Sequence, residues 1–250
     1  MKIKVLYEDL NILAIDKPSG ILVHPDQRNK DKTILDLFIK KYPKLEIVHR
    51  LDRETSGIML LAKNKKTHEF LKKQFANRKV KKTYVTVVSG FVKSNHGFIN
   101  KPIGRSPRDF RRHLAGRGAR GAMREAITEY KVIKRFEVAI LHKISSRSSH
   151  KNRSHADKKF YEAPQKFTYL EVYPKTGRTH QIRVHMKFLN HPVACDSLYN
   201  PDMSCPSGFS RLALHAKSIE FKNLKGKTIK LESSLPKEFK KLVNLPGRQV

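Results

Sequence analysis

The chain has 250 residues, of which 38% are hydrophobic and 30% are charged, a composition that fits a soluble globular protein. No apolar run approaches the roughly 20 residues that a transmembrane helix needs, and residues 1–16 lack the apolar core and cleavage site of a signal peptide. Lys and Arg number 53 against 22 Asp and Glu, and the net charge of +31 indicates a polyanionic partner. Nucleic acid is favoured over a membrane surface, because the sequence lacks Trp and shows no amphipathic basic helix with aromatic anchors.

The first residues predict a strand hairpin. Residues 3–7 and 12–15 are strand-like, and the segment KPSG at 17–20 is a turn. Residues 33–42 then predict a short helix that is capped by Asp31 or Thr33.

The segment VHRLDRETSG places Asp52 between Arg50 and Arg53 and leads into an apolar strand at 58–62. A lone Asp beside two Arg residues is more often a surface ion pair. Here Leu51 and the strand behind it indicate that the loop is held against a core. A carboxylate held beside guanidinium groups stays ionised at neutral pH, as a nucleophile or a base must. Asp52 is therefore the candidate catalytic residue.

Residues 65–78 predict a basic helix with Phe70, Leu71 and Phe75 as its buried stripe. Residues 81–88 predict a β-branched strand.

Tyr84 lies on this predicted strand. The common role of a strand Tyr is cross-strand packing, and the alternative is a ring that stacks on an unstacked base. Two Lys residues just before it modestly favour the alternative.

Arg and Gly dominate residues 105–124, which we expect to form a basic loop. The glycines at 116, 118 and 121 satisfy GxGxxG, but no hydrophobic strand precedes them, so a dinucleotide site is rejected. Two interpretations have equal weight: a loop that orders when it grips RNA, and a solvated disordered segment. The RNA-contacting candidates here are Arg111, Arg112, Arg117 and Arg120.

Residues 127–136 and 167–173 predict strands, and the polar, basic segment 143–165 between them predicts a loop or linker insertion. After the turn that follows, residues 178–189 predict a helix. Its inward residues are Ile182, Met186 and Leu189, so Arg183 falls off the apolar stripe and is able to point to a cleft.

No metal site is expected. His180 and His185 are five residues apart, which suits joint ligands poorly, and HExxH is absent. Cys195 and Cys205 do not form a CxxC pair, so we expect neither a disulfide framework nor a zinc site, which fits a reducing cytoplasm. Beyond them, residues 211–221 lead into a strand, and a final strand and a helix beginning near Pro236 close the chain.

HRLDRETSG and TGRTHQIRVH resemble two motifs of the RluA-type pseudouridine synthases. The resemblance implies that Asp52 is the catalytic Asp, that Arg183 pairs with it, and that Tyr84 lies against the target uridine. It also implies that Leu214 packs against the bound base, with low weight because a plain core residue is the alternative. The family usually has Gly before Asp196, where this chain has Cys195, so we expect a local packing change in that turn.

The resemblance extends over most of the chain except the 143–165 insertion. It implies an α+β fold: a single catalytic domain over 1–250 with a central mixed, mainly antiparallel β-sheet, short flanking helices and a basic RNA-binding cleft. We expect no separate N-terminal RNA-binding domain. The family commonly carries an extended RNA-contacting hairpin where this chain has its Arg/Gly segment.

The expected function is isomerisation of specific uridines in structured ribosomal or transfer RNA, by a monomeric cytoplasmic enzyme without cofactor or metal. The target nucleotide must leave its helix, and Arg50 helps to fill the gap. Arg178 and His180 complete the candidates for contact with RNA. A non-catalytic RNA-binding or ribosome-assembly protein on the same scaffold is the alternative. A zinc base deaminase is excluded, because H-x-E and P-C-x-x-C are absent.

Overall fold

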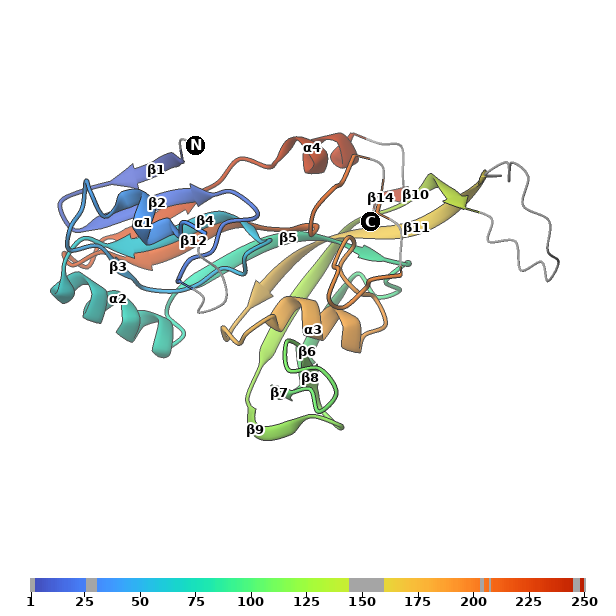
Figure 1. Cartoon of the computed structure of the whole chain (residues 1–250), viewed down its shortest axis with the longest axis horizontal. Helices are drawn as coiled ribbons and strands as arrows, with labels where there is room; N and C mark the ends of the chain where they lie inside the picture. Colours follow the sequence, from blue (N-terminus) through green and yellow to red (C-terminus); the bar gives the residue numbers. More distant parts are fainter. Residues whose placement is uncertain are drawn as a thin grey trace.

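The computed structural model describes residues 3–25, 31–143, 160–202, 205–206, 208–244 and 248–249. These residues form one large sheet, one small sheet and a few short helices (Figure 1). The predicted α+β fold with a mixed, mainly antiparallel sheet is therefore confirmed. The helices are α1 (Ile34–Phe38), α2 (Lys65–Ala76), α3 (Gln181–Phe188) and α4 (Lys237–Val243).

The large sheet runs in the order β1-β2-β4-β12-β5-β11-β10-β14, with β3, β13 and β6 paired to β4, β12 and β10. Every pair is antiparallel except β4 with β12. The strands of this sheet are β1 (Lys4–Glu8), β2 (Ile12–Lys17), β3 (Glu46–Ile47), β4 (Ser56–Ala62), β5 (Lys81–Ser89), β6 (His96–Asn100), β10 (Ile127–Lys143), β11 (Phe160–Pro174), β12 (Leu214–Lys222), β13 (Thr228–Glu232) and β14 (Arg248–Gln249).

The parallel pair sets the position of the Asp52 loop, which directly precedes β4. All seven residues of β4 are buried, and Gly57 has a φ of +112° opposite Ala216 of β12. A Cβ at Gly57 would lie 2.2 Å from the carbonyl oxygen of Ala216, so only glycine allows the two strands to approach this closely. The loop consequently ends at the centre of the sheet.

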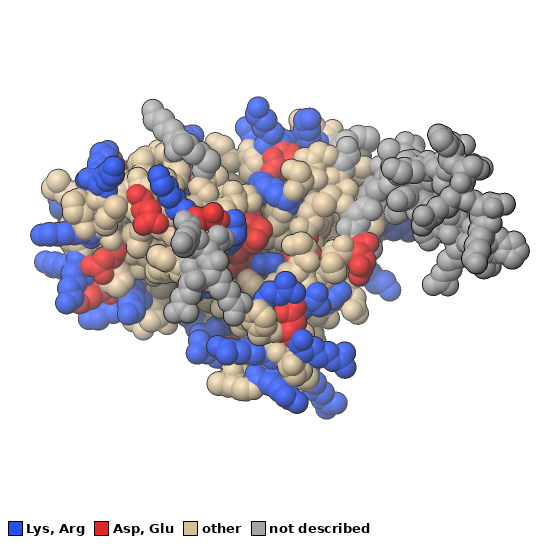
Figure 2. Space-filling view, viewed as in Figure 1, with Lys and Arg blue, Asp and Glu red and all other residues tan. Residues whose placement is uncertain are grey.

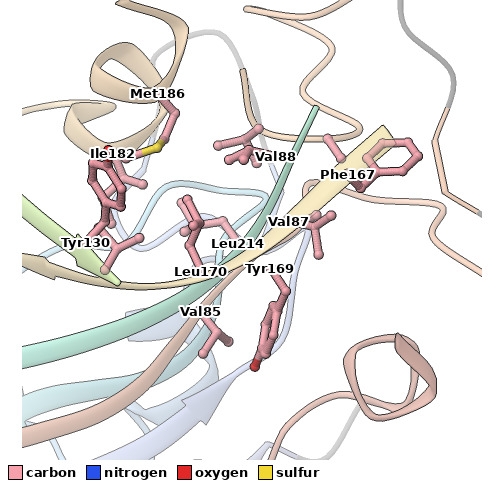
Figure 3. Close-up of a cluster of buried hydrophobic side chains, with 14 of the residues drawn as sticks. Val85, Val87, Val88, Tyr130, Phe167, Tyr169, Leu170, Ile182, Met186 and Leu214 are labelled. Atoms are coloured by element: carbon pink, nitrogen blue, oxygen red, sulfur yellow. The ribbon is translucent and has the colours of Figure 1, made fainter. Parts of the chain in front are cut away.

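Two hydrophobic clusters cover the sheet. One joins β2, β4 and the C-terminal part of β12 to α1 and α2, and includes Leu51. The other gathers side chains from β5, β10, β11, α3 and the start of β12 (Figure 3). The inward residues predicted for α3 are confirmed, since Ile182 and Met186 are buried in this cluster and Leu189 packs against it. Tyr84 packs against both clusters.

The predicted Arg/Gly loop is wrong, because residues 103–124 form a three-stranded sheet in the order β8-β7-β9. Its strands are β7 (Ile103–Arg105), β8 (His113–Ala115) and β9 (Arg120–Arg124). A small cluster that includes Ile103, Val184 and Tyr199 anchors this sheet to α3. Gly121, the last of the GxGxxG glycines, lies within β9, and this agrees with the rejection of a dinucleotide site, which would need a helix there.

Several predicted boundaries need correction. The helix predicted at 33–42 is shorter, because α1 ends at Phe38. Helix α3 begins at Gln181 rather than at 178, because His180 has a φ of +54° and stands outside the helix. The insertion predicted at 143–165 is too long at its C-terminal end, because pairing of β10 with β11 extends to the Lys143–Phe160 pair. Residues 144–159 of that insertion lie outside the described residues.

The prediction that Cys195 and Cys205 form no disulfide is also wrong: the structure joins them, with 5.1 Å between their Cα atoms. The reason is the path of the chain, which folds back between the two residues, and a spacing of ten residues does not reveal this. Cys195 has a φ of +57°, so it adopts the left-handed conformation expected of the glycine it replaces. Within the described part of the chain, no helix is long and apolar enough to cross a membrane.

Candidate active site

Lys17 and Ser19, at the turn formed by residues 17–20, hold the Asp52 loop in place through hydrogen bonds. The Lys17 ammonium is buried and donates hydrogen bonds to the carbonyls of Pro18 and Arg53, both at 2.9 Å. The Ser19 hydroxyl donates to the carbonyl of Glu54 at 2.6 Å. Burial lowers the pKa of Lys17 to about 8, although the charges of Asp52 and Glu54 oppose the shift. The Asp52 loop is therefore fixed on its inner side by backbone contacts.

Arg183 of α3 joins two carboxylates. Its Nη1 lies 3.3 Å from Oδ2 of Asp52, while its Nε and Nη2 donate to Asp196 at 2.7 and 2.8 Å. The Asp196 side chain is fully buried, whereas that of Asp52 is 20% exposed. Burial alone would lower the pKa of Arg183, but the hydrogen bonds and charge of Asp196, with the charge of Asp52, raise it. The guanidinium is therefore a fixed cation, and Asp52 is the reachable carboxylate.

Aromatic and imidazole rings hold this guanidinium in place. Arg183 lies over the ring of Tyr199, with 5.1 Å from its central carbon to the ring centre. The Tyr199 hydroxyl contacts Nδ1 of His180 at 3.0 Å and accepts a hydrogen bond from the backbone of His113 at 2.9 Å. Burial lowers the pKa of His180, and Asp52 only partly offsets the shift, so this ring is mainly neutral at pH 7.

A small pocket of about 80 Å³ brings together residues that sequence analysis proposed separately. Asp52, Tyr84, Ile182, Arg183 and Leu214 all line it, and His180 stands at the same pocket. Burial and the charge of Asp52 raise the pKa of Tyr84, so its hydroxyl stays protonated at neutral pH. The pocket thus combines the aromatic and apolar surface of these side chains with one carboxylate and several cationic side chains, which are Arg50, Lys82, Arg178 and Arg183.

A larger cavity of about 420 Å³ adjoins this small pocket and shares Asp52 and Tyr84 with it. Among the described residues that line it, Asp52 is the one carboxylate. Five cationic side chains also line it: Arg50, Arg78, Lys82, Lys175 and Arg178. The cavity is therefore suited to a polyanionic ligand that lies along the cationic side chains and reaches Asp52 at one end.

The predicted arginines of the Arg/Gly segment lie elsewhere. Arg111 and Arg112 pair with Asp109, Arg117 is exposed, and none of the three lines either pocket. Arg120 lines a separate groove of about 470 Å³, together with Arg105, Arg124 and Arg178. Figure 2 shows Lys and Arg side chains gathered at the lower end of the molecule, where Figure 1 places β7, β8 and β9.

Three residues of the site have no role that the sequence predicted: Asp196, Lys17 and Tyr199. Asp196 follows the apolar segment PVAC, and a carboxylate in such a segment is a weak sign of a buried ion pair. In the sequence, Lys17 stood out only as the first residue of a predicted turn. Tyr199 carried no signal, because its role depends on where α3 and β8 meet.

Comparison with known proteins places this geometry in context. The family model described as RNA pseudouridylate synthase matches residues 11–188. The chain is 34% identical to ribosomal large subunit pseudouridine synthase D of Xanthomonas campestris pv. campestris, over 97% of this chain and 69% of that protein. It is 31% identical to the RNA pseudouridine synthase YlyB of Bacillus subtilis, over 97% of this chain and 72% of that protein.

The solved structure of human RNA pseudouridylate synthase domain containing 1 superposes with a TM-score of 0.70, covering 99% of this chain and 97% of that one. Their sequences are 20% identical, so this match concerns the fold. Together the matches bear out the family resemblance that the two motifs predicted.

Proposed function

Because the chain belongs to the RNA pseudouridylate synthase family, whose members are isomerases, we propose that it converts uridine in a structured RNA to pseudouridine, with Asp52 as the essential carboxylate. The reaction breaks the N1–C1′ glycosidic bond, turns the uracil, and joins its C5 to the same C1′. One proton leaves C5 and one is gained at N1, so the product has the atoms of the substrate and no oxidant or reductant is consumed.

One observation carries the assignment of Asp52. Of the two carboxylates on Arg183, Asp196 is fully buried, whereas Asp52 is partly exposed and lines both the small pocket and the larger cavity. Of these two carboxylates, only Asp52 is therefore within reach of a ribose. Both proposed roles, attack on the sugar or base and abstraction of a proton, require a carboxylate aimed at the ring atoms, and the contact with Arg183 supplies that aim.

The walls of the small pocket suit the detached uracil. Tyr84 offers a ring on which the base stacks, and Leu214 and Ile182 offer apolar surface. A base inside a duplex is out of reach of this pocket, so the nucleotide must flip out, which costs a few kcal/mol. The exposed Arg50 stands beside Asp52 and is placed to fill the gap left in the RNA.

We infer a ribosomal RNA of the large subunit as the first substrate to test, because relatives at 31–34% identity carry that substrate in their names. Transfer RNA is the second RNA to map. A monomer that works on RNA in the cytoplasm completes the proposal.

The test compares cells that lack the protein with cells that carry the wild type, Asp52→Asn or Asp31→Asn. Asp31 is the control, because it pairs with Arg53 at the surface and lies outside both pockets. Pseudouridines are mapped chemically in ribosomal and transfer RNA. We expect a site that disappears without the protein and returns with the wild type and Asp31→Asn only, while purified Asp52→Asn still binds RNA. If no site disappears, or if Asp52→Asn restores it, the proposed function is wrong.

A further inference from the structure

Lys82 lies on β5 two residues before Tyr84, so both side chains project from the same face of the strand. Both line the small pocket and the larger cavity. Lys81 projects from the other face, where its side chain is 78% exposed and pairs with Glu220 at 2.7 Å. The two neighbouring lysines therefore have different surroundings, and only Lys82 faces the proposed active site.

Lys82 is a half-buried cation, and no carboxylate of the described residues pairs with it. Its ammonium donates one hydrogen bond, to the carbonyl of Thr176 at 3.0 Å. No carboxylate among the described residues lies within ion-pair distance of it, although an ammonium has three N–H donors. Burial lowers the pKa of Lys82 to about 8, because no opposite charge compensates for its lost hydration. An anion that enters the cavity would supply that charge.

Other cations of the cavity differ in this respect. Arg78 pairs with Glu125, and Lys175 pairs with Glu129 at 2.6 Å, so both already have a partner at the surface. Arg50 is exposed, and Arg178 is half-buried like Lys82 but donates to the carbonyl of Glu125 at an exposed position, whereas the contact of Lys82 with Thr176 is partly buried.

The position of Lys82 favours a phosphate over the uracil ring. The Lys82 ammonium donates to the carbonyl of Thr176, while Tyr84 lines the small pocket together with Asp52 and Leu214. Two strand residues separate Lys82 from Tyr84 by roughly 7 Å, so the two side chains are able to contact different parts of one nucleotide. A base stacked on Tyr84 would thus leave the backbone near Lys82.

We propose that Lys82 binds a backbone phosphate of the RNA strand that carries the target uridine, as an anion site at the inner end of the larger cavity. This inference rests on the proposed function and adds the group that holds the strand while the nucleotide is flipped. Its ligand is a phosphodiester, so Lys82 contributes to affinity without reading the base sequence.

The experiment uses an RNA oligonucleotide that carries the mapped uridine, and a set in which one phosphate at a time is a neutral methylphosphonate. Dissociation constants are measured against KCl concentration for the wild type, Lys82→Met, Lys82→Arg and the control Lys81→Met. Loss of one charge-assisted contact predicts about tenfold weaker binding by Lys82→Met. The slope of log K against log salt should fall by about 0.7, the contribution of one phosphate on a single strand.

One methylphosphonate position should weaken binding by the wild type and leave Lys82→Met unaffected, because the contact is already lost. Lys82→Arg should keep most of the affinity and the salt slope, and Lys81→Met should match the wild type. An unchanged salt slope in Lys82→Met, with only a lower unfolding midpoint, would show that the lysine merely supports Thr176 and would overturn the proposal. Equal sensitivity of Lys82→Met and the wild type to every methylphosphonate would also overturn it.

Failure of this inference is distinguishable from failure of the proposed function. Pseudouridine formation by the wild type is measured on the same oligonucleotide. If it forms and Lys82→Met binds as the wild type does, only the phosphate contact is wrong. If none forms while Lys82→Met shows the expected loss of affinity, the proposed function is wrong and the phosphate contact stands.

Discussion

Asp196 holds Arg183 through two hydrogen bonds of 2.7 and 2.8 Å, whereas Asp52 contacts one terminal nitrogen of the same guanidinium at 3.3 Å. The first pair is buried and nearly ideal in geometry, and the second is longer and partly exposed. Asp196 thus holds the arginine in place, while Asp52 keeps lone pairs available for a substrate.

The two carboxylates should therefore respond differently to the same substitution. Asp196→Asn removes one partner of a buried ion pair and should lower the free energy of unfolding by about 3–5 kcal/mol. Asp52→Asn should lower it by less than about 1 kcal/mol, because that pair is partly solvated. Urea unfolding of both variants measures the difference, and equal losses would contradict this division of roles.

Tyr84 should act through its ring. Tyr84→Phe keeps the stacking surface and should retain more activity than Tyr84→Leu. A base that stacks on an aromatic ring gains about 1–3 kcal/mol, so Tyr84→Leu should lower kcat/KM by roughly 5- to 150-fold. Single-turnover assays on the mapped RNA compare the two variants. Greater damage from Tyr84→Phe than from Tyr84→Leu would assign the main role to the hydroxyl.

Lys17 should stabilise the Asp52 loop without touching the substrate. Lys17→Met removes the side-chain donor to the carbonyls of Pro18 and Arg53, and only that of Arg53 keeps another hydrogen bond, from the backbone of Gly20. We expect a loss of about 1–3 kcal/mol in unfolding free energy per unsatisfied group, together with lower activity. Faster hydrogen exchange at Arg53, Glu54 and Thr55 would identify the loosened loop. Unchanged hydrogen exchange at these residues would contradict the stabilising role of Lys17.

Gly57 should tolerate no side chain. Gly57→Ala forces a Cβ against the backbone of Ala216 at a φ of +112°, so we expect a loss of at least about 3 kcal/mol. Gly118→Ala is the matched control, since Gly118 has a φ of +87° but open space around it, and it should lose only about 1–2 kcal/mol. Chemical unfolding of the two variants compares the costs, and similar values would show that β4 and β12 separate easily.

His215 should make the fold sensitive to acid. Burial and the charge of Arg211 lower the pKa of His215 from 6.5 to about 4. The unfolded chain therefore takes up a proton between these values while the folded chain does not, so stability falls as pH drops from 6.5 towards 4. The slope is about 1.4 kcal/mol per pH unit. His215→Gln should remove this part of the dependence of stability on pH. The control His96→Gln, at an exposed position, should leave it unchanged.

Periodicity predicted most elements, because α2, α3, β4 and β5 carry clear apolar patterns. It failed for β7, β8 and β9, whose three to five residues are mostly Arg, Gly and Ala and whose anchor to the core is a few side chains such as Ile103. The contact between Asp52 and Arg183 was predicted from the resemblance of their two motifs to the family. Asp196 and Lys17 escaped notice, because their roles depend on tertiary contacts that no local pattern encodes.

The contact between Asp52 and Arg183 spans 131 positions of the sequence, and its two ends are anchored in different hydrophobic clusters. Strand β12, which comes after both residues, contributes buried side chains to both clusters. Contacts of such long range form late in folding, after the loops between them have closed. A chain still being synthesised and lacking β12 would thus be inactive, and isomerase activity would report that β12 has joined the two clusters.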